Sequence, residues 1–159
     1  MPVPPDIALE LSKLYGKPCC RKSTGEFHSF SLGFGEKVFN ENKGKLARKG
    51  PEFYGEYEIG TYHREWRVLS LGLVVCGGCD LVDSNAEFDE SFCKIEFGSV
   101  ISIFQPNNID VHVDFDNGLG LDIFSARCYD DEIFHVFSPG HYIGFNPNVG
   151  WVLEDLARP

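Results

Sequence analysis

Two cysteines separated by two glycines, Cys76-Gly-Gly-Cys79, have the spacing of a metal or redox motif. A structural zinc site needs four ligands and commonly takes them from two such pairs. A redox motif of the thioredoxin type has a helix directly after its strand, and no helix is predicted to follow at once here. The remaining cysteines do not repeat the spacing: Cys19, Cys20, Cys93 and Cys128. The pattern therefore favours a turn between two thiols over metal or redox chemistry.

Three residues of a predicted hairpin, His112, Asp114 and Asp122, share one face of it. Two carboxylates and an imidazole could hold a divalent metal or relay a proton. A solvated sheet face shows the same alternation, however, and a cross-strand pair of His112 and Asp122 contributes about 0.2–1 kcal/mol. We favour the structural interpretation for this group and for a second one on an earlier strand: His63, Glu65 and Arg67.

The local sequences of common enzymes are missing from the chain. It has no GxSxG for a serine nucleophile, no GxGxxG opening a helix, no GxxxxGK[ST] and no HExxH. We therefore predict a protein that is not an enzyme, with no catalytic residues, no metal site and no cofactor.

The hairpin over residues 110–124 is the element that the sequence specifies best. A two-residue loop would mix apolar and acidic side chains on each face, whereas the three-residue loop Asp116-Asn117-Gly118 separates them. Gly118 suits the left-handed last position of such a loop. The resulting register places His112 opposite Asp122 and pairs the apolar residues: Phe115 with Leu119, Val113 with Leu121, and Val111 with Ile123.

A second hairpin is predicted to turn through Ser70-Leu71-Gly72. Val74 would then oppose Val68, and Cys76 would oppose Trp66. Because residues 73–75 are continuously apolar, we expect this return strand to be interior and covered on both faces.

Periodicity and turn residues predict the other elements. Residues 83–98 fit either a helix capped by Ser84 or Asn85 or a strand, and we favour the helix. Residues 40–51 are expected to form a solvated loop rather than a phosphate-binding one. The rest are a helix over residues 7–15 with Asp6 as N-cap, strands over 26–34, 99–104 and 128–137, and a short closing segment within 144–159.

These elements predict a single domain over residues 1–159. We expect an α+β fold that is mainly antiparallel β. Its sheet would be curled or partly closed and contain about seven to nine strands, with an N-terminal helix and possibly a second helix across it.

The charge is unevenly distributed along the chain. Residues 1–75 hold 11 Lys and Arg and 9 Asp and Glu, a balance of +2. Residues 76–159 hold 3 Lys and Arg and 15 Asp and Glu, a balance of −12, so the two parts sum to the net charge of −10. Such a field repels nucleic acid and anionic membranes and attracts basic partners. With no signal peptide and no long apolar run, we expect a cytoplasmic protein whose thiols stay reduced.

Two segments, GEYEIGTYHREWRV at 55–68 and VHVDFDNGLGLDIF at 111–124, resemble a recurrent pattern in small uncharacterised bacterial proteins. The pattern runs helix, L-x-G, strand, G-E-[YW]-x-[IF]-x-T…W-R-[IV], then a hairpin L-x-F-x-x-G-L-x-L-x-[IV]-F, and it spans most of residues 7–137. Such small acidic proteins resemble the immunity partners encoded beside polymorphic or contact-dependent toxins. The resemblance implies a toxin-neutralising role and brings no catalytic residues with it.

The function expected from these observations is that of an acidic immunity protein, which neutralises a basic toxin domain by steric and electrostatic blocking. One alternative is a small-molecule-binding barrel or small enzyme using His63, Glu65, His112 and Asp114, and another is a structural or assembly module. The partner-binding residues would be acidic ones on exposed faces and loops: Asp83, Glu87, Asp89, Glu90, Asp114, Asp122, Asp130 and Asp131.

Overall fold

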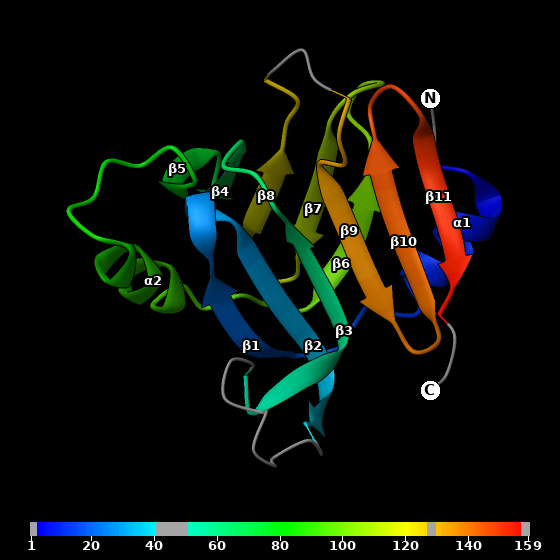
Figure 1. Ribbon diagram of the computed structural model, residues 1–159, viewed down its shortest axis with the longest axis horizontal. Helices are drawn as coiled ribbons and strands as arrows, with labels where there is room; N and C mark the ends of the chain where they lie inside the picture. Colours follow the sequence, from blue (N-terminus) through cyan, green and yellow to red (C-terminus); the bar gives the residue numbers. More distant parts are fainter. Residues whose placement is uncertain (1–2, 41–50, 127–129, 157–159) are drawn as a thin grey trace.

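The computed structural model describes residues 3–40, 51–126 and 130–156. Within these residues the chain forms two antiparallel sheets, two α-helices and one short 3-10 helix (Figure 1). The six-stranded sheet has the order β1 (Cys19–Thr24), β2 (Phe30–Phe39), β3 (Phe53–Thr61), β9 (Phe134–Ser138), β10 (His141–Asn146) and β11 (Gly150–Asp155). The five-stranded sheet has the order β5 (Leu73–Gly77), β4 (Trp66–Ser70), β8 (Leu119–Ile123), β7 (Val111–Phe115) and β6 (Val100–Phe104). The helices are α1 (Pro5–Ser12), α2 (Asn85–Cys93) and the 3-10 turn η1 (Glu26–His28).

The predicted α+β class with mainly antiparallel strands is confirmed, but the predicted sheet is not. In the described part of the chain, eleven strands in two open sheets replace a single curled sheet of about seven to nine. The sequence pattern missed β1, β10 and β11. In β1 and over most of β11 the residues are half-buried on both faces, so these segments lack the apolar–polar alternation that marks a strand.

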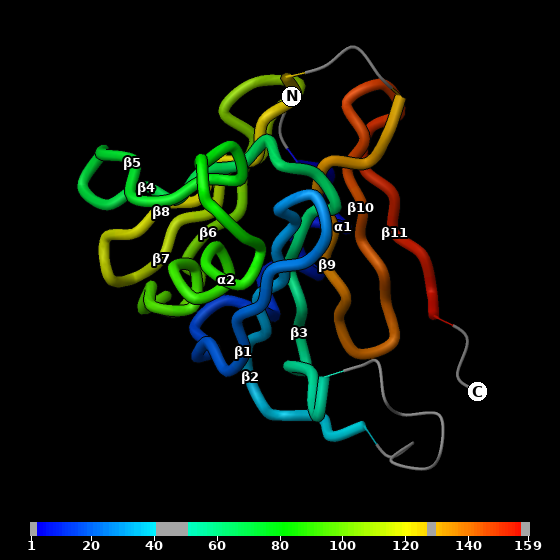
Figure 2. Tube along the Cα trace, turned by 60° about the vertical axis from the view of Figure 1, so that its left-hand side comes forward, coloured from blue at the N-terminus to red at the C-terminus, as the bar shows by residue number. Residues whose placement is uncertain are grey.

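The inner faces of the two sheets pack on each other, and α2 closes one end of the core. Phe34 on β2 stacks on Phe115 on β7, with ring centroids 6.2 Å apart, and Phe30 meets Trp66 edge to face at 4.9 Å. The indole N–H of Trp66 donates to the carbonyl of His28 at 2.8 Å, so this buried ring is satisfied. Apolar side chains from both sheets and both α-helices form this core. β5 and β11 lie on opposite sides of the molecule in both views (Figures 1 and 2).

The β7–β8 hairpin has the predicted register. Val111 pairs with Ile123, His112 with Asp122 and Val113 with Leu121. Gly118 occupies the left-handed region, with φ +87°, at the last position of the predicted loop. The apolar set is buried in the core apart from the half-buried Leu119, as the segregation of side chains between the two faces predicted.

The β4–β5 hairpin differs from its prediction. Leu71 and Gly72 both have positive φ, 51° and 81°, so the turn has two residues and Ser70 pairs with Leu73. Leu69 then pairs with Val74 and Val68 with Cys76, which leaves Val75 as the extra residue of a β-bulge. The return strand is also not interior: β5 is the edge of its sheet, and Leu73, Val74 and Val75 are exposed.

The helix favoured over residues 83–98 exists as α2. The Ser84 side chain accepts from the backbone N–H of Glu87 at 3.1 Å, and Phe88 and Phe92 are buried. The helix ends at Cys93 rather than at Gly98, since residues beyond Cys93 leave the helix to reach β6.

Two N-terminal predictions were wrong in detail. Asp6 is not the N-cap of α1, because the helix begins at Pro5 and Pro4 precedes it without a side-chain cap. The strand predicted from Glu26 begins only at Phe30, because Phe27 and His28 have positive φ and form η1.

No helix in the described ranges is both long and apolar enough to cross a membrane. The basic stretch within residues 40–51 and Cys128 fall outside the described residues, apart from Asn40 and Pro51.

Candidate binding surface and pocket

The outer edge of the five-stranded sheet is an exposed apolar surface, which we call the β5 edge: Leu71, Leu73, Val74, Val75 and Leu81. Their exposed fractions are 89%, 73%, 55%, 53% and 100%. The bulge beside Val68 produces this exposure, because it turns Cys76 toward the core and leaves the two valines outside. Three of the five lie on β5 itself, and Leu71 and Leu81 lie in the turn before it and the loop after it. Exposed apolar residues that are not scattered singly are typical of a protein-interaction site.

The β5 edge also lacks the features that normally protect an edge strand. β5 pairs only with β4 among the described strands, and its sequence, LVVCG, contains no charged residue and no proline. Edge strands usually avoid adding a foreign strand by carrying lysine, proline or an inward-pointing charge. The β5 edge is therefore suited to receive another chain.

Acidic residues follow the β5 edge directly in the sequence. Asp83, Glu87 and Glu90 are exposed on α2 and the segment before it, and the Asp83 N–H donates to Glu87 Oε2 at 3.2 Å. Asp80 accepts from the Gly77 N–H at 3.0 Å at the end of β5. Figure 1 shows α2 on the same side of the molecule as β5. The segment that follows the apolar edge in the sequence is thus acidic.

Asp89, also predicted to bind a partner, holds α2 to the six-stranded sheet. Its Oδ1 accepts from the backbone N–H of Thr24 at 2.9 Å and from the Thr24 hydroxyl at 2.8 Å. These two bonds occupy one oxygen of a half-buried carboxylate.

Asp114 and Asp122 lie on β7 and β8, on either side of His112. His112 Nδ1 is 2.5 Å from Asp122 Oδ1, and Nε2 is 2.9 Å from Asp114 Oδ1. Arg67 Nε donates to the other oxygen of Asp122 at 2.9 Å. The four side chains form a hydrogen-bonded network on the outer face of the five-stranded sheet, as expected for a cross-strand pair.

Asp130 and Asp131 lie before β9, in a third part of the fold. Asn146 Nδ2 donates to Asp130 at 2.9 Å, and His63 Nε2 is 3.2 Å from Asp131. The eight predicted acidic residues therefore belong to three separate groups of elements. Three of them, Asp83, Glu87 and Glu90, follow the β5 edge in the sequence.

The four residues of the enzyme alternative are not brought to one pocket. His63 and Glu65 line a pocket of about 290 Å³ together with Tyr62 and Arg64. His112 and Asp114 lie on β7, in the five-stranded sheet. In the described part of the chain, no three His, Cys, Asp or Glu side chains are grouped so as to hold a metal ion.

The cysteines that the structure describes are free thiols: Cys19, Cys20, Cys76, Cys79 and Cys93. Burial raises the pKa of Cys19 and of Cys76 to about 11. A thiol with so high a pKa is protonated at neutral pH and is a poor nucleophile. Cys79 is exposed, and its thiol lies 3.6 Å from the Arg64 carbonyl.

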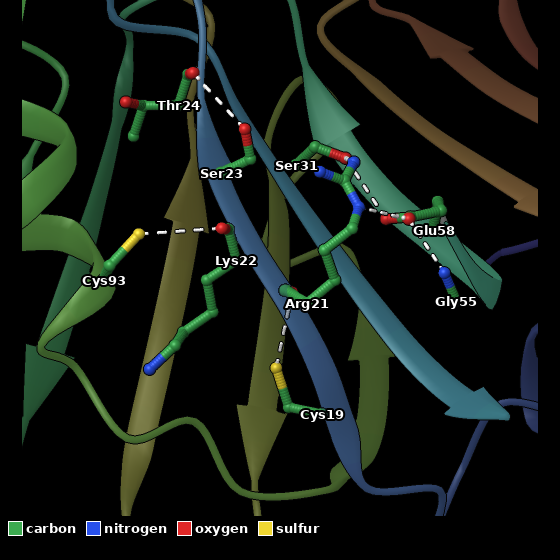
Figure 3. Close-up of polar contacts among 9 residues, drawn as sticks. All are labelled: Cys19, Arg21, Lys22, Ser23, Thr24, Ser31, Gly55, Glu58 and Cys93. Carbon is green, nitrogen blue, oxygen red and sulfur yellow. Dashed lines mark hydrogen bonds and ion pairs between the residues drawn. The ribbon is translucent and has the colours of Figure 1, made fainter. Parts of the chain in front are cut away.

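A group that the sequence did not single out lies on the outer face of the six-stranded sheet. Glu58 Oε1 accepts from Arg21 Nε at 2.8 Å and from the Gly55 N–H at 3.0 Å, and Oε2 accepts from the Ser31 hydroxyl at 3.2 Å. Arg21 also donates to Ser31 at 3.0 Å, which links β1, β2 and β3 (Figure 3). The guanidinium of Arg21 lies over the Tyr54 ring, 5.2 Å from its centroid. Glu58 is buried although it faces outward.

A pocket of about 540 Å³ opens beside this network. His135 on β9 lines it and is also buried, with Nδ1 3.2 Å from Glu132 Oε1. The Tyr62 ring covers His135, with centroids 4.6 Å apart, and Tyr142 donates to Glu132. Burial, with a smaller contribution from the Glu132 charge, raises the pKa of Tyr62.

One sequence signal could have pointed to this pocket. Two positions after Glu58, on the same face of its strand, stands Gly60, so one neighbour of the carboxylate carries no side chain. His135 gave no such signal, because it stands in an apolar run and its neighbours are set by the pairing of β3 with β9.

Comparison of the chain with protein-family models, with curated proteins and with solved structures gave no match.

Proposed function

We propose that this protein is a cytoplasmic binding protein of the immunity type, which neutralises a basic bacterial toxin domain by covering part of its surface. It acts by binding rather than by catalysis. The observation that carries the proposal is the β5 edge: an unprotected apolar edge strand whose sequence neighbours are acidic.

The two components of this surface have different roles in binding. Apolar side chains that leave water at the centre of an interface supply affinity, and Leu73, Val74 and Val75 offer such a centre. Acidic groups around them mainly raise the association rate with a basic partner. A second copy of this chain is a poorer occupant, because each copy carries a net charge of −10.

The proposal requires a basic toxin domain encoded beside this chain, and it is tested with that domain. We expect the wild-type protein to bind that domain and to restore growth when the two are co-expressed. Val74→Lys, which places a charge on the β5 edge, should raise the Kd about tenfold or more. Binding is measured by surface plasmon resonance at several salt concentrations.

A charge-reversal pair separates the electrostatic part of the proposal. Asp83→Lys with Glu87→Lys should slow association about tenfold and flatten its salt dependence. The matched control, Glu154→Lys with Asp155→Lys, makes the same charge change on β11, at the opposite side of the molecule. The proposal is contradicted if the association rate of the wild type does not change with salt concentration, or if the control variant slows association as much as Asp83→Lys with Glu87→Lys does.

A further inference from the structure

The pocket on the outer face of the six-stranded sheet includes two glycines in its lining, Gly25 and Gly55. Ser31, Gly60 and His135 are paired across three neighbouring strands, as are Gly33, Glu58 and Phe137. Gly33 and Gly60 contribute no side chain to these rows, so Glu58 and His135 can lie close over them: a Cβ on Gly33 would lie 3.0 Å from Glu58 Oε1. A Cβ on Gly60 would lie 3.1 Å from His135 Nε2 and 2.5 Å from the Phe30 carbonyl oxygen.

The polar lining of this pocket is close to neutral and rich in hydroxyl groups. Glu58 is the one carboxylate of the lining, and its ion pair with Arg21 neutralises it, which disfavours an ionic ligand. The ion pair and the hydroxyl of Ser31 hold one another in place, so these donors and acceptors are fixed before any ligand enters (Figure 3). Fixed, planar, charged groups make the strongest directional hydrogen bonds to a neutral partner.

The apolar lining consists mainly of aromatic rings. Tyr62 and Phe137 form part of the wall, and the volume of about 540 Å³ is within the range of small-molecule sites. Aromatic faces pack against the C–H face of a flat ring while its hydroxyls turn to polar groups. The pocket combines both features, and it includes none of the β5-edge residues.

We propose that this pocket binds a neutral, ring-shaped polyol of the size of a monosaccharide. Glu58 and Ser31 supply hydrogen bonds to its hydroxyls, Arg21 holds both side chains in place, and Tyr62 packs on the ring. This site lies on the six-stranded sheet, whereas the β5 edge belongs to the other sheet, so the two proposals stand or fall separately.

The test is a titration of the isotope-labelled protein with glucose, galactose, mannose and N-acetylglucosamine, followed by amide NMR shifts. We expect at least one sugar to cause saturable shifts at Ser31, Gly55 and Thr61. Tyr62→Ala should weaken that binding roughly tenfold. Because Tyr62 is largely exposed, the variant is expected to fold.

The control is Phe104→Ala, which removes another exposed aromatic ring, on β6 of the other sheet. It should leave the sugar affinity unchanged. The proposal is overturned if none of the four sugars gives saturable shifts at these amides, or if Tyr62→Ala binds as tightly as the wild type.

Discussion

At the scale of single residues, buried and exposed ion pairs differ strongly in how much the loss of one partner changes the stability of the fold. Lys94 and Glu90 on α2 are both largely exposed, and such a pair contributes at most about 0.5 kcal/mol. Arg21 and Glu58 are both mostly buried, so either charge would be strongly unfavourable without the other. The pair therefore ties three strands together while keeping an outward-facing carboxylate out of water.

Arg21→Met tests this difference. The substitution leaves Glu58 buried without its cation, and we expect the free energy of unfolding to fall by about 3 kcal/mol. The double variant with Glu58→Gln should recover much of that loss, because the amide still accepts from the Gly55 N–H. Urea denaturation of the single and double variants measures both changes.

Lys94→Met is the matched control, because it removes a cation from an exposed pair. It should change the unfolding free energy by less than about 0.5 kcal/mol. Equal losses for Arg21→Met and Lys94→Met would show that the Glu58 pair is no more important than a surface one.

At the scale of elements, the two hairpins of the five-stranded sheet show how a turn determines a surface. In the β7–β8 hairpin a glycine takes the left-handed position, and the apolar residues face the core. In the β4–β5 hairpin a leucine takes such a position, at φ 51°, and a bulge follows. A non-glycine residue in this region is strained, and the bulge turns apolar residues outward.

Leu71→Asn should relieve that strain. Asparagine tolerates positive φ far better than leucine does, and the exposed leucine side chain buries little surface that could be lost. We expect the free energy of unfolding to rise by about 0.5–1 kcal/mol, measured by urea denaturation. Val74→Asn, which makes a similar change on the strand itself, is the control and should give no gain. A loss of stability with Leu71→Asn would mean that its side chain stabilises the turn.

At the scale of the whole molecule, the burial of thiols links stability to pH. Cys19 and Cys76 hold their protons up to a pKa of about 11 in the folded protein, against an ordinary value of 9.0. Between these values the unfolded chain releases protons that the folded chain retains, so rising pH favours unfolding. Burial also raises the pKa of Tyr15, which acts in the same direction.

The free energy of unfolding should therefore fall between about pH 8 and about pH 10, by about 1 kcal/mol for each of the two thiols. Urea denaturation across this range measures the decline. Cys76→Ala should show a shallower decline than the wild type, whatever its stability at neutral pH. A decline of the same steepness in both proteins would exclude Cys76 as a cause.

Some of this architecture could be predicted from local patterns alone. Segregation of apolar and polar residues specified the β7–β8 register, and the Ser84 cap with Phe88 and Phe92 favoured α2, because these signals lie within one element. The antiparallel α+β class followed from short strands joined by glycine-bearing turns.

The tertiary structure alone decided which strands lie at an edge and which distant side chains meet. The apolar sequence of β5 predicted an interior strand, but β5 lies at the edge of its sheet, because apolar composition does not reveal whether a partner strand is present. Arg21 and Glu58 are 37 positions apart and come together only through the pairing of β1 with β2 and of β2 with β3. Hydrophobic periodicity reports which face of a strand is buried, but it contains no information on which strand lies beside it.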